Sequence, residues 1–303
     1  MNHPRKGRPS GRRSYHSELV GAIGRYLPHR GFPLRVADRR VRWTDRLLIS
    51  AALLMGWQRG VATLQEAFQA AREVVVAMYG SRRRPGRNLS GFVKALTHRG
   101  GTLCQRVVPA LRRATQRLAG PAWRYGGYVP LAVDGTRIAC PRTGANEAAF
   151  GTGAKAQGMP QQQLTTVFHV GVGLPWDWRR GRGDASERRH LHEMLGALPS
   201  ATLLLMDAGY TGFELLGELV SRGQAFIVRV GRNVRLLREL GYAVREDAGT
   251  VYLWPQRQQD QAPLVLRLVK VRSGGTPVYL LTSVRDGTRL SDAAIATLYR
   301  QRW

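Results

Sequence analysis

Two short stretches of this chain each join an apolar run to a single aspartate, and they restrict the fold more than any other feature. The stretches are Leu131-Ala-Val-Asp-Gly-Thr136 and Leu203-Leu-Leu-Met-Asp-Ala-Gly-Tyr210. An apolar run of this length that is followed by glycine is typical of a buried strand. A buried strand rarely carries a carboxylate unless something compensates its charge. If the two strands are neighbours in one sheet, Asp134 and Asp207 lie where a divalent cation can bridge them.

The charge of the chain indicates a polyanionic partner. The 303 residues carry a net charge of +27, and only four of the 47 basic residues are lysine. Arginine presents a planar fork that can bind phosphate through two hydrogen bonds. A general preference for arginine codons would explain arginine over lysine, but it would not explain the excess of bases over acids. We therefore expect the partner to be nucleic acid.

The rest of the composition is that of a globular protein large enough for two or three domains, with 43% hydrophobic residues. The longest apolar stretch, 47–57, is too short to span a bilayer. Cys104 and Cys140 lie far apart and form no CxxC motif, which excludes a disulfide framework or a zinc site built from cysteines. The basic N-terminus lacks the apolar segment of a signal peptide. We expect a cytoplasmic protein without a membrane partner.

The first part of the chain predicts a basic arm followed by helices. Residues 1–16 are expected to be an arm without regular structure, in which Arg12 and Arg13 contact DNA. Residues 17–124 are expected to form a helical DNA-binding domain, although a domain that only supports the rest of the chain is an open alternative. Its expected helices are 45–57 after a Thr44 cap, 64–79 after a Thr63–Glu66 capping box, 90–97, and 102–118 beyond Gly100-Gly101.

From residue 125 the pattern changes to that of an α/β domain, which predicts a mixed sheet with flanking helices. The expected strands are 131–140, 164–172, 174–180, 202–206, 225–230 and 277–283, and the expected helices are 184–198, 211–222 and a final one capped by Ser291 or Asp292. Residues 232–276 contain short alternating strands between Gly, Pro and Gln-rich turns. They predict a β-rich insertion rather than a continuation of the α/β layer.

Three blocks in this second part resemble the transposases of the IS4-like insertion-sequence group. They run from Val133 to Gly151, from Leu204 to Val230 with its Asp-Ala-Gly-Tyr motif, and from Tyr279 to Trp303 with Leu298-Tyr-Arg-Gln-Arg-Trp303. The resemblance covers the chain from about residue 128 onward. It implies an RNase H-like fold over 125–303 with a DDE catalytic core, in which three acids hold Mg²⁺ or Mn²⁺.

The resemblance also assigns roles to single residues. Asp134 matches the first catalytic aspartate and Asp207 the second, both as metal ligands. Tyr299 and Arg302 match the start of the signature Y-x-x-R-x-x-x-E, whose glutamate would fall three positions beyond Trp303. We therefore interpret the domain as incomplete at its C-terminus. The candidate DNA contacts are Tyr299, Arg302, Arg12, Arg13, Arg137 and Lys155. Arg137 and Lys155 follow the first strand, and each is equally suited to a solvated surface.

The missing acid matters because two Mg²⁺ ions about 4 Å apart normally activate the nucleophile and stabilise the leaving oxygen in phosphodiester cleavage. Mg²⁺ prefers hard oxygen ligands. With two acids we expect weak metal binding and little strand transfer. Glu147, which follows the first strand by a loop, is interpreted as a surface residue, and His169 as a buried histidine. The other polar candidates are interpreted as helix surface (Glu214, Glu218, His190, His192, Glu193).

The resemblance therefore implies a DNA transposase of a mobile element in the bacterial cytoplasm, associated with the nucleoid. It would bind double-stranded DNA at terminal inverted repeats and at the target, cleave it, transfer strands, and work as a homodimer. Two alternatives remain open. A non-catalytic DNA-binding fragment would occupy the ends and repress transposition, and an RNase H-like nuclease would cut RNA–DNA hybrids.

Overall fold

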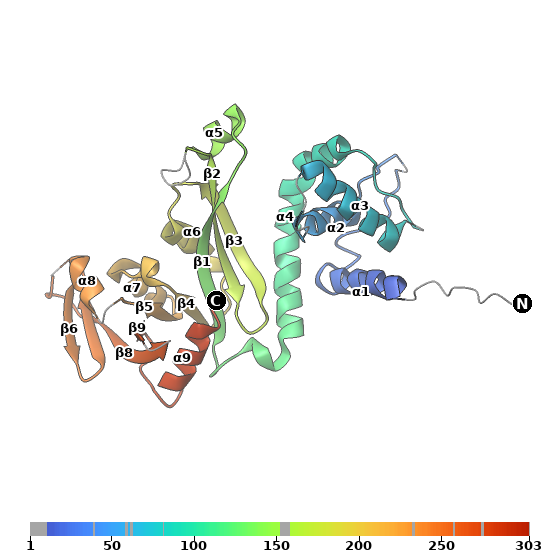
Figure 1. Ribbon diagram of the computed structural model, residues 1–303. Coiled ribbons are helices and arrows are strands. Elements are labelled where there is room, and N and C mark those ends of the chain that lie inside the picture. The colour runs from blue at the N-terminus through green and yellow to red at the C-terminus, as the bar shows by residue number, and fades with distance from the viewer. Residues whose placement is uncertain are drawn as a thin grey trace, which may run out of the picture. The chain divides into compact units, whose positions relative to one another are not determined.

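The computed structural model describes residues 11–38, 40–57, 60, 63–80, 82–151, 158–231, 234–256, 258–273 and 276–302. The chain divides into two compact units, residues 1–114 and residues 115–303 (Figure 1). The division falls inside one long helix, α4 (Leu89–Ala119), whereas the sequence pattern changes at about residue 125.

The first unit is helical. Its helices are α1 (Gly11–Tyr26), α2 (Asp45–Trp57), α3 (Leu64–Tyr79) and the main part of α4. Three aromatic rings lie in its core, those of Trp43, Phe68 and Phe92, with centroids 5.1 to 6.0 Å apart. Because α1 begins at Gly11, Arg12 and Arg13 lie in a helix and not in the expected irregular arm. No proline occurs in the sequence between Pro9 and Pro28, so nothing breaks the helix in that interval.

The two expected N-caps differ in outcome. The capping box before α3 is confirmed, since Thr63 Oγ1 accepts from the Glu66 N–H at 3.1 Å and Glu66 Oε2 accepts from the Thr63 N–H at 3.2 Å. Thr44 does precede α2, but its buried hydroxyl has no hydrogen-bond partner among the described residues. Helix α2 is therefore held by its buried apolar residues rather than by a side-chain cap.

The prediction of two short helices at 90–97 and 102–118 is wrong, because α4 runs through Gly100 and Gly101 without a break. Three buried residues of α4 that belong to the core cluster of this unit, Phe92, Leu103 and Ala110, recur at intervals that fit whole helical turns. This stripe packs into one core cluster across the glycines. Packing along the whole face thus outweighs the low helix propensity of two glycines.

The second unit confirms the predicted mixed α/β fold. Its strands are β1 (Val129–Ala139), β2 (Gln161–His169), β3 (Leu174–Arg182), β4 (Thr202–Met206), β5 (Ala225–Arg229), β6 (Ala243–Asp247), β7 (Thr250–Trp254), β8 (Leu264–Ser273) and β9 (Thr276–Thr282). They form one sheet in the order β3-β2-β1-β4-β5-β9-β8-β7-β6. The pairs β1–β4 and β4–β5 are parallel and the others antiparallel, with β2 and β3 forming a hairpin. The helices of this unit are α5 (Gly144–Phe150), α6 (Glu187–Met194), α7 (Phe213–Ser221), α8 (Arg235–Glu239), α9 (Asp292–Arg300) and the 3₁₀ turns η1 (Gly120–Trp123), η2 (Leu195–Ala197) and η3 (Ala208–Tyr210).

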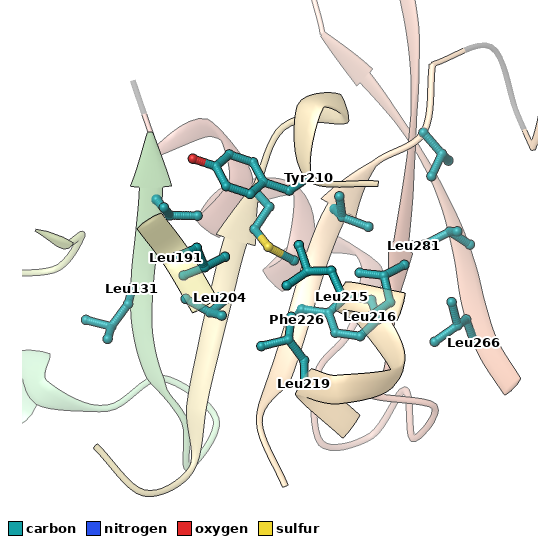
Figure 2. Close-up of a cluster of buried hydrophobic side chains, with 14 of the residues drawn as sticks. Leu131, Leu191, Leu204, Tyr210, Leu215, Leu216, Leu219, Phe226, Leu266 and Leu281 are labelled. Atoms are coloured by element: carbon teal, nitrogen blue, oxygen red, sulfur yellow. The ribbon is translucent and has the colours of Figure 1, made fainter. Parts of the chain in front are cut away.

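Helices cover both faces of the central strands. Side chains of α6 and α7 pack on one face, as Figure 2 shows for Leu191 beside Leu131 and Leu204, and for Leu215 and Leu219 beside Phe226. On the opposite face, residues of α9 pack against alternate positions of the same strands in a second cluster, whose members include Ala132, Leu203, Leu205, Ile295 and Leu298. The central strands are therefore buried on both sides, as apolar runs without alternation predict.

The segment 232–276 is β-rich, as predicted, but the expectation that it does not continue the α/β layer is wrong, because its strands join the main sheet. Residues 267–273 of β8 pair with the whole of β9, and β7 and β6 follow outward in the same sheet (Figure 1). Val251, Leu253 and Leu266 belong to the same core cluster as the central strands. The alternating pattern of this segment gives each strand an apolar face, and the existing sheet already offers a surface on which to bury it.

Candidate active site

The register of the sheet sets the two aspartates side by side. β1 and β4 run parallel, and their last paired residues are Ala132 and Leu205. Asp134 and Asp207 each come two residues later, so the same register places them opposite each other. Side chains alternate along a strand. Since Ala132 and Leu205 face α9, both carboxylates point to that face as well.

An arginine just after the end of α9 lies between the two carboxylates. Arg302 Nη2 is 3.7 Å from Asp134 Oδ1 and 3.6 Å from Asp207 Oδ2. The Arg302 side chain is fully buried, whereas the two aspartates are 32% and 39% exposed. Tyr299 accepts a hydrogen bond from Arg302 Nη1 at 3.3 Å and thereby orients the guanidinium. One buried cation thus holds two partly exposed carboxylates together.

The loop that carries Asp207 is fixed from two sides. Asp207 Oδ1 accepts from the Gly209 N–H at 2.8 Å and caps the short turn η3. Arg188 of α6 donates to the carbonyl oxygens of Gly209 and Thr211, at 2.7 and 2.6 Å. The Thr211 hydroxyl in turn donates to the Arg229 carbonyl at the end of β5. The position of the second carboxylate is therefore set by backbone and side-chain hydrogen bonds from two neighbouring elements.

The surroundings of Asp134 disfavour its charged form. Burial raises the pKa of the Asp134 carboxyl above its ordinary value, and the negative charge of Asp207 acts in the same direction. The Gly135 N–H and the Arg302 guanidinium lower the pKa and offset part of this effect. A further cation that binds beside Asp134 would stabilise the ionised carboxylate, which burial disfavours.

A third carboxylate lies behind the first strand, and the sequence interpretation missed it. Glu187, in the first turn of α6, accepts from Gln163 Nε2 at 3.2 Å and from the Tyr210 hydroxyl at 3.3 Å. A Cβ on Gly135 would come within 2.2 Å of the Glu187 carboxyl carbon. Burial, followed by the charge of Glu187, raises the pKa of Tyr210. The only sequence signal was an acid directly after the Ser186 N-cap.

Among the other predicted DNA contacts, Arg137 does not join the two aspartates. Arg137 lies three residues after Asp134 on β1, so its side chain is on the opposite face of the sheet. Its Nε donates to the Gly183 carbonyl at 2.9 Å. Lys155 lies outside the described residues. Arg12 and Arg13 belong to the helical unit.

The acids and histidines interpreted as structural have ordinary partners. Glu147 pairs with Arg142, Glu214 accepts from Tyr242, and Glu218 pairs with His192 and Arg222. His169 is buried and stacks on Trp123 with ring centroids 5.0 Å apart. His190 is an exception to the expected helix surface, because it is buried and its Nδ1 lies 2.9 Å from Thr165 Oγ1. The inner side of α6 carries it toward the sheet.

The site fits a hard divalent cation through two oxygen donors. Asp134 and Asp207 supply carboxylates that share one face and are reached by solvent. Mg²⁺ in proteins is commonly held by one or two carboxylates and completes its shell with water. Within the described ranges, no group of three or more His, Cys, Asp or Glu side chains is arranged to hold a metal ion. The donor set therefore suits one weakly held cation rather than a closed cage.

Comparison with known proteins identifies a family. Residues 125–303 match the family model described as "Transposase DDE domain", which covers more than half of the chain. No curated protein matches the chain. Among the described helices, none has the length and apolar character to cross a bilayer.

Proposed function

The chain belongs to the transposase DDE domain family, and on that premise we propose that it is the DNA transposase of a mobile element of the IS4-like group. It binds double-stranded DNA at terminal inverted repeats and at the target, cleaves the strands and joins them. The chain works as a homodimer that brings the two DNA ends together. It does so in the bacterial cytoplasm, associated with the nucleoid. The observation that carries the proposal is the juxtaposition of Asp134 and Asp207 on one face of parallel neighbouring strands.

Asp134 and Asp207 hold the metal, Mg²⁺ or Mn²⁺, in this proposal. The bound ion supplies Lewis acidity for water activation and for the leaving oxygen. Arg302 keeps the two carboxylates together and partly neutralises them, and Tyr299 fixes its orientation. Because the Arg302 side chain is buried, its expected contact with DNA needs a movement of the last turn of α9. Arg188 and Gly209 keep the Asp207 loop rigid.

The test is nicking of end-containing duplex DNA by the full chain with Mg²⁺ or Mn²⁺. Asp134→Asn and Asp207→Asn should each lower the nicking rate by at least about 100-fold, since each removes a charged metal ligand. Asp184→Asn is the matched control, because this aspartate has a side chain 78% exposed and lies outside the site. Cleavage that persists in both active-site variants would sink the proposal.

The variant Asp134→Asn also shows whether a loss of nicking comes from a lost metal ligand or from unfolding. Since the pKa of Asp134 is raised in the folded protein, the folded state binds more protons than the unfolded state, and stability falls as pH rises through that pKa. Asparagine carries no charge. Asp134→Asn should therefore have a higher unfolding midpoint than the unchanged chain at neutral pH, and the gain should vanish below the ordinary carboxyl pKa. Urea denaturation at several pH values measures this, and a lower midpoint at neutral pH would assign the lost nicking to unfolding.

A second function, a non-catalytic DNA-binding protein that represses transposition, is favoured by one observation. The described part of the chain offers two acids for the metal, and a buried guanidinium sits within 4 Å of both. Both features weaken cation binding. End-specific DNA binding without nicking, at every divalent cation tested, would support this function over the enzyme. Specific cutting of RNA–DNA hybrids would instead support the nuclease alternative.

A further inference from the structure

The helical unit carries a set of exposed arginines on two segments that are locked together. The segments are 35–42, of which the structure describes 35–38 and 40–42, between α1 and α2, and 82–87, between α3 and α4. Arg83 Nη2 of the second segment donates to the carbonyl oxygens of Asp38 and Val41 in the first. The arginine-rich connector is therefore not a free loop.

The connector is also anchored to the core of the unit. Pro85 is buried, and Arg72 of α3 donates to the Gly86 carbonyl at 2.9 Å. A Cβ at Gly86 would come within 2.6 Å of the indole nitrogen of Trp43, so only glycine lets the chain pass this close. Trp43 belongs to the aromatic core of the unit. The backbone beneath the arginines is thus fixed before any ligand binds.

Five exposed arginines line two hollows in this surface, which we term the arginine surface. They are Arg35, Arg42, Arg82, Arg84 and Arg87. Arg42 and Arg84 line both hollows, so the hollows adjoin. Asp38 is the one acidic residue in the sequence of the two segments, and none of the five arginines pairs with an acidic side chain within the described ranges. Like charges gathered in this way repel each other unless an anion neutralises them.

We propose that the arginine surface binds the phosphate backbone of duplex DNA and contributes affinity that does not depend on sequence. The inference rests on the proposed function, which supplies duplex DNA as the partner. Base edges lie on the floor of a groove and are read by a protruding helix or ribbon. A concave surface of guanidinium groups instead receives the projecting phosphate chain, and the fixed backbone lowers the ordering cost of binding.

The experiment measures binding of the full chain to two labelled duplexes of unrelated sequence over a series of salt concentrations. The variant Arg42→Gln/Arg82→Gln/Arg84→Gln should reduce the slope of log affinity against log salt by about 3 and weaken binding roughly 10- to 100-fold, equally for both duplexes. The lysine triple variant at the same positions keeps the charge. It should retain the slope and lose only part of the affinity.

Arg30→Gln/Arg113→Gln is the matched control, because both side chains are exposed in the same unit and line a different hollow. Two results overturn the inference while leaving the proposed function intact. One is an unchanged salt slope in the glutamine triple variant, and the other is a control variant that loses as much slope for each removed charge as the triple variant does. Failure of the unchanged chain to bind duplex DNA overturns both. Circular dichroism shows whether the glutamine variant folds. If it does not fold, the lysine variant tests the inference, because a reduced salt slope in a variant that keeps the charge contradicts a role based on charge.

Discussion

At the scale of single residues, the sequence predicted the pair of aspartates in the site, but it could not predict the contact behind the first strand. Asp134 and Asp207 were predicted because a carboxylate in an apolar strand is a local anomaly. The contact of Glu187 with Gly135 joins residues far apart in the chain and leaves no local pattern. As the predicted strand 131–140 requires, β1 continues through Gly135, which lies opposite Thr165. In a strand, such a glycine marks a close approach rather than an end.

Gly135→Ala should test this close approach. The added methyl group would displace the Glu187 carboxylate from its hydrogen bonds with Gln163 and Tyr210, so we expect a loss of unfolding free energy of about 1–3 kcal/mol. Gly217→Ala, inside α7 with nothing within 4 Å of its new Cβ, should be neutral or stabilising. Urea denaturation compares the two. Adding Glu187→Ala to Gly135→Ala should recover part of the loss, and simple additivity of the two changes would contradict the packing argument.

At the scale of elements, strand patterns predicted the second unit well, because apolar runs between turn residues are short and distinct. The strand at 202–206 has the predicted bounds, and the final helix begins after the predicted Ser291 cap. Helix continuity was harder to predict. A Gly-Gly pair lowers local helix propensity, but whether a helix breaks there depends on the surface that it packs against. Likewise, no pattern inside 232–276 could tell that its strands join the main sheet.

The continuity of α4 can be measured. Alanines at Gly100 and Gly101 meet only Leu96, at an ordinary contact distance of 3.7 Å or more. The double variant Gly100→Ala/Gly101→Ala should therefore raise the unfolding free energy by about 1–2 kcal/mol and increase the helical signal in circular dichroism. Gly120, just after α4, has a φ of +48° and should lose stability when changed to alanine. A destabilised double variant would mean that the helix needs flexibility at this position.

At the scale of the whole molecule, charge is the dominant property. A net charge of +27 in 303 residues makes the compact state repel itself, and a bound polyanion relieves this repulsion. Duplex DNA at low salt should therefore raise the thermal unfolding midpoint, by an amount equivalent to about 2.7 kcal/mol at a hundred times the dissociation constant. The rise should shrink as salt increases, because salt screens the contacts. A neutral polymer of similar mass is the control, and an equal rise with that polymer would point to crowding rather than to charge.

The parallel register of β1 and β4 also limits which insertions and deletions the gene can tolerate. Because alternate side chains point to opposite faces, loss or gain of one codon within 203–206 would turn the carboxylate of Asp207 toward α6 and away from Arg302. Many point substitutions in this strand could be absorbed by repacking. A length change of a single residue would separate the two carboxylates while leaving the composition of the strand almost the same.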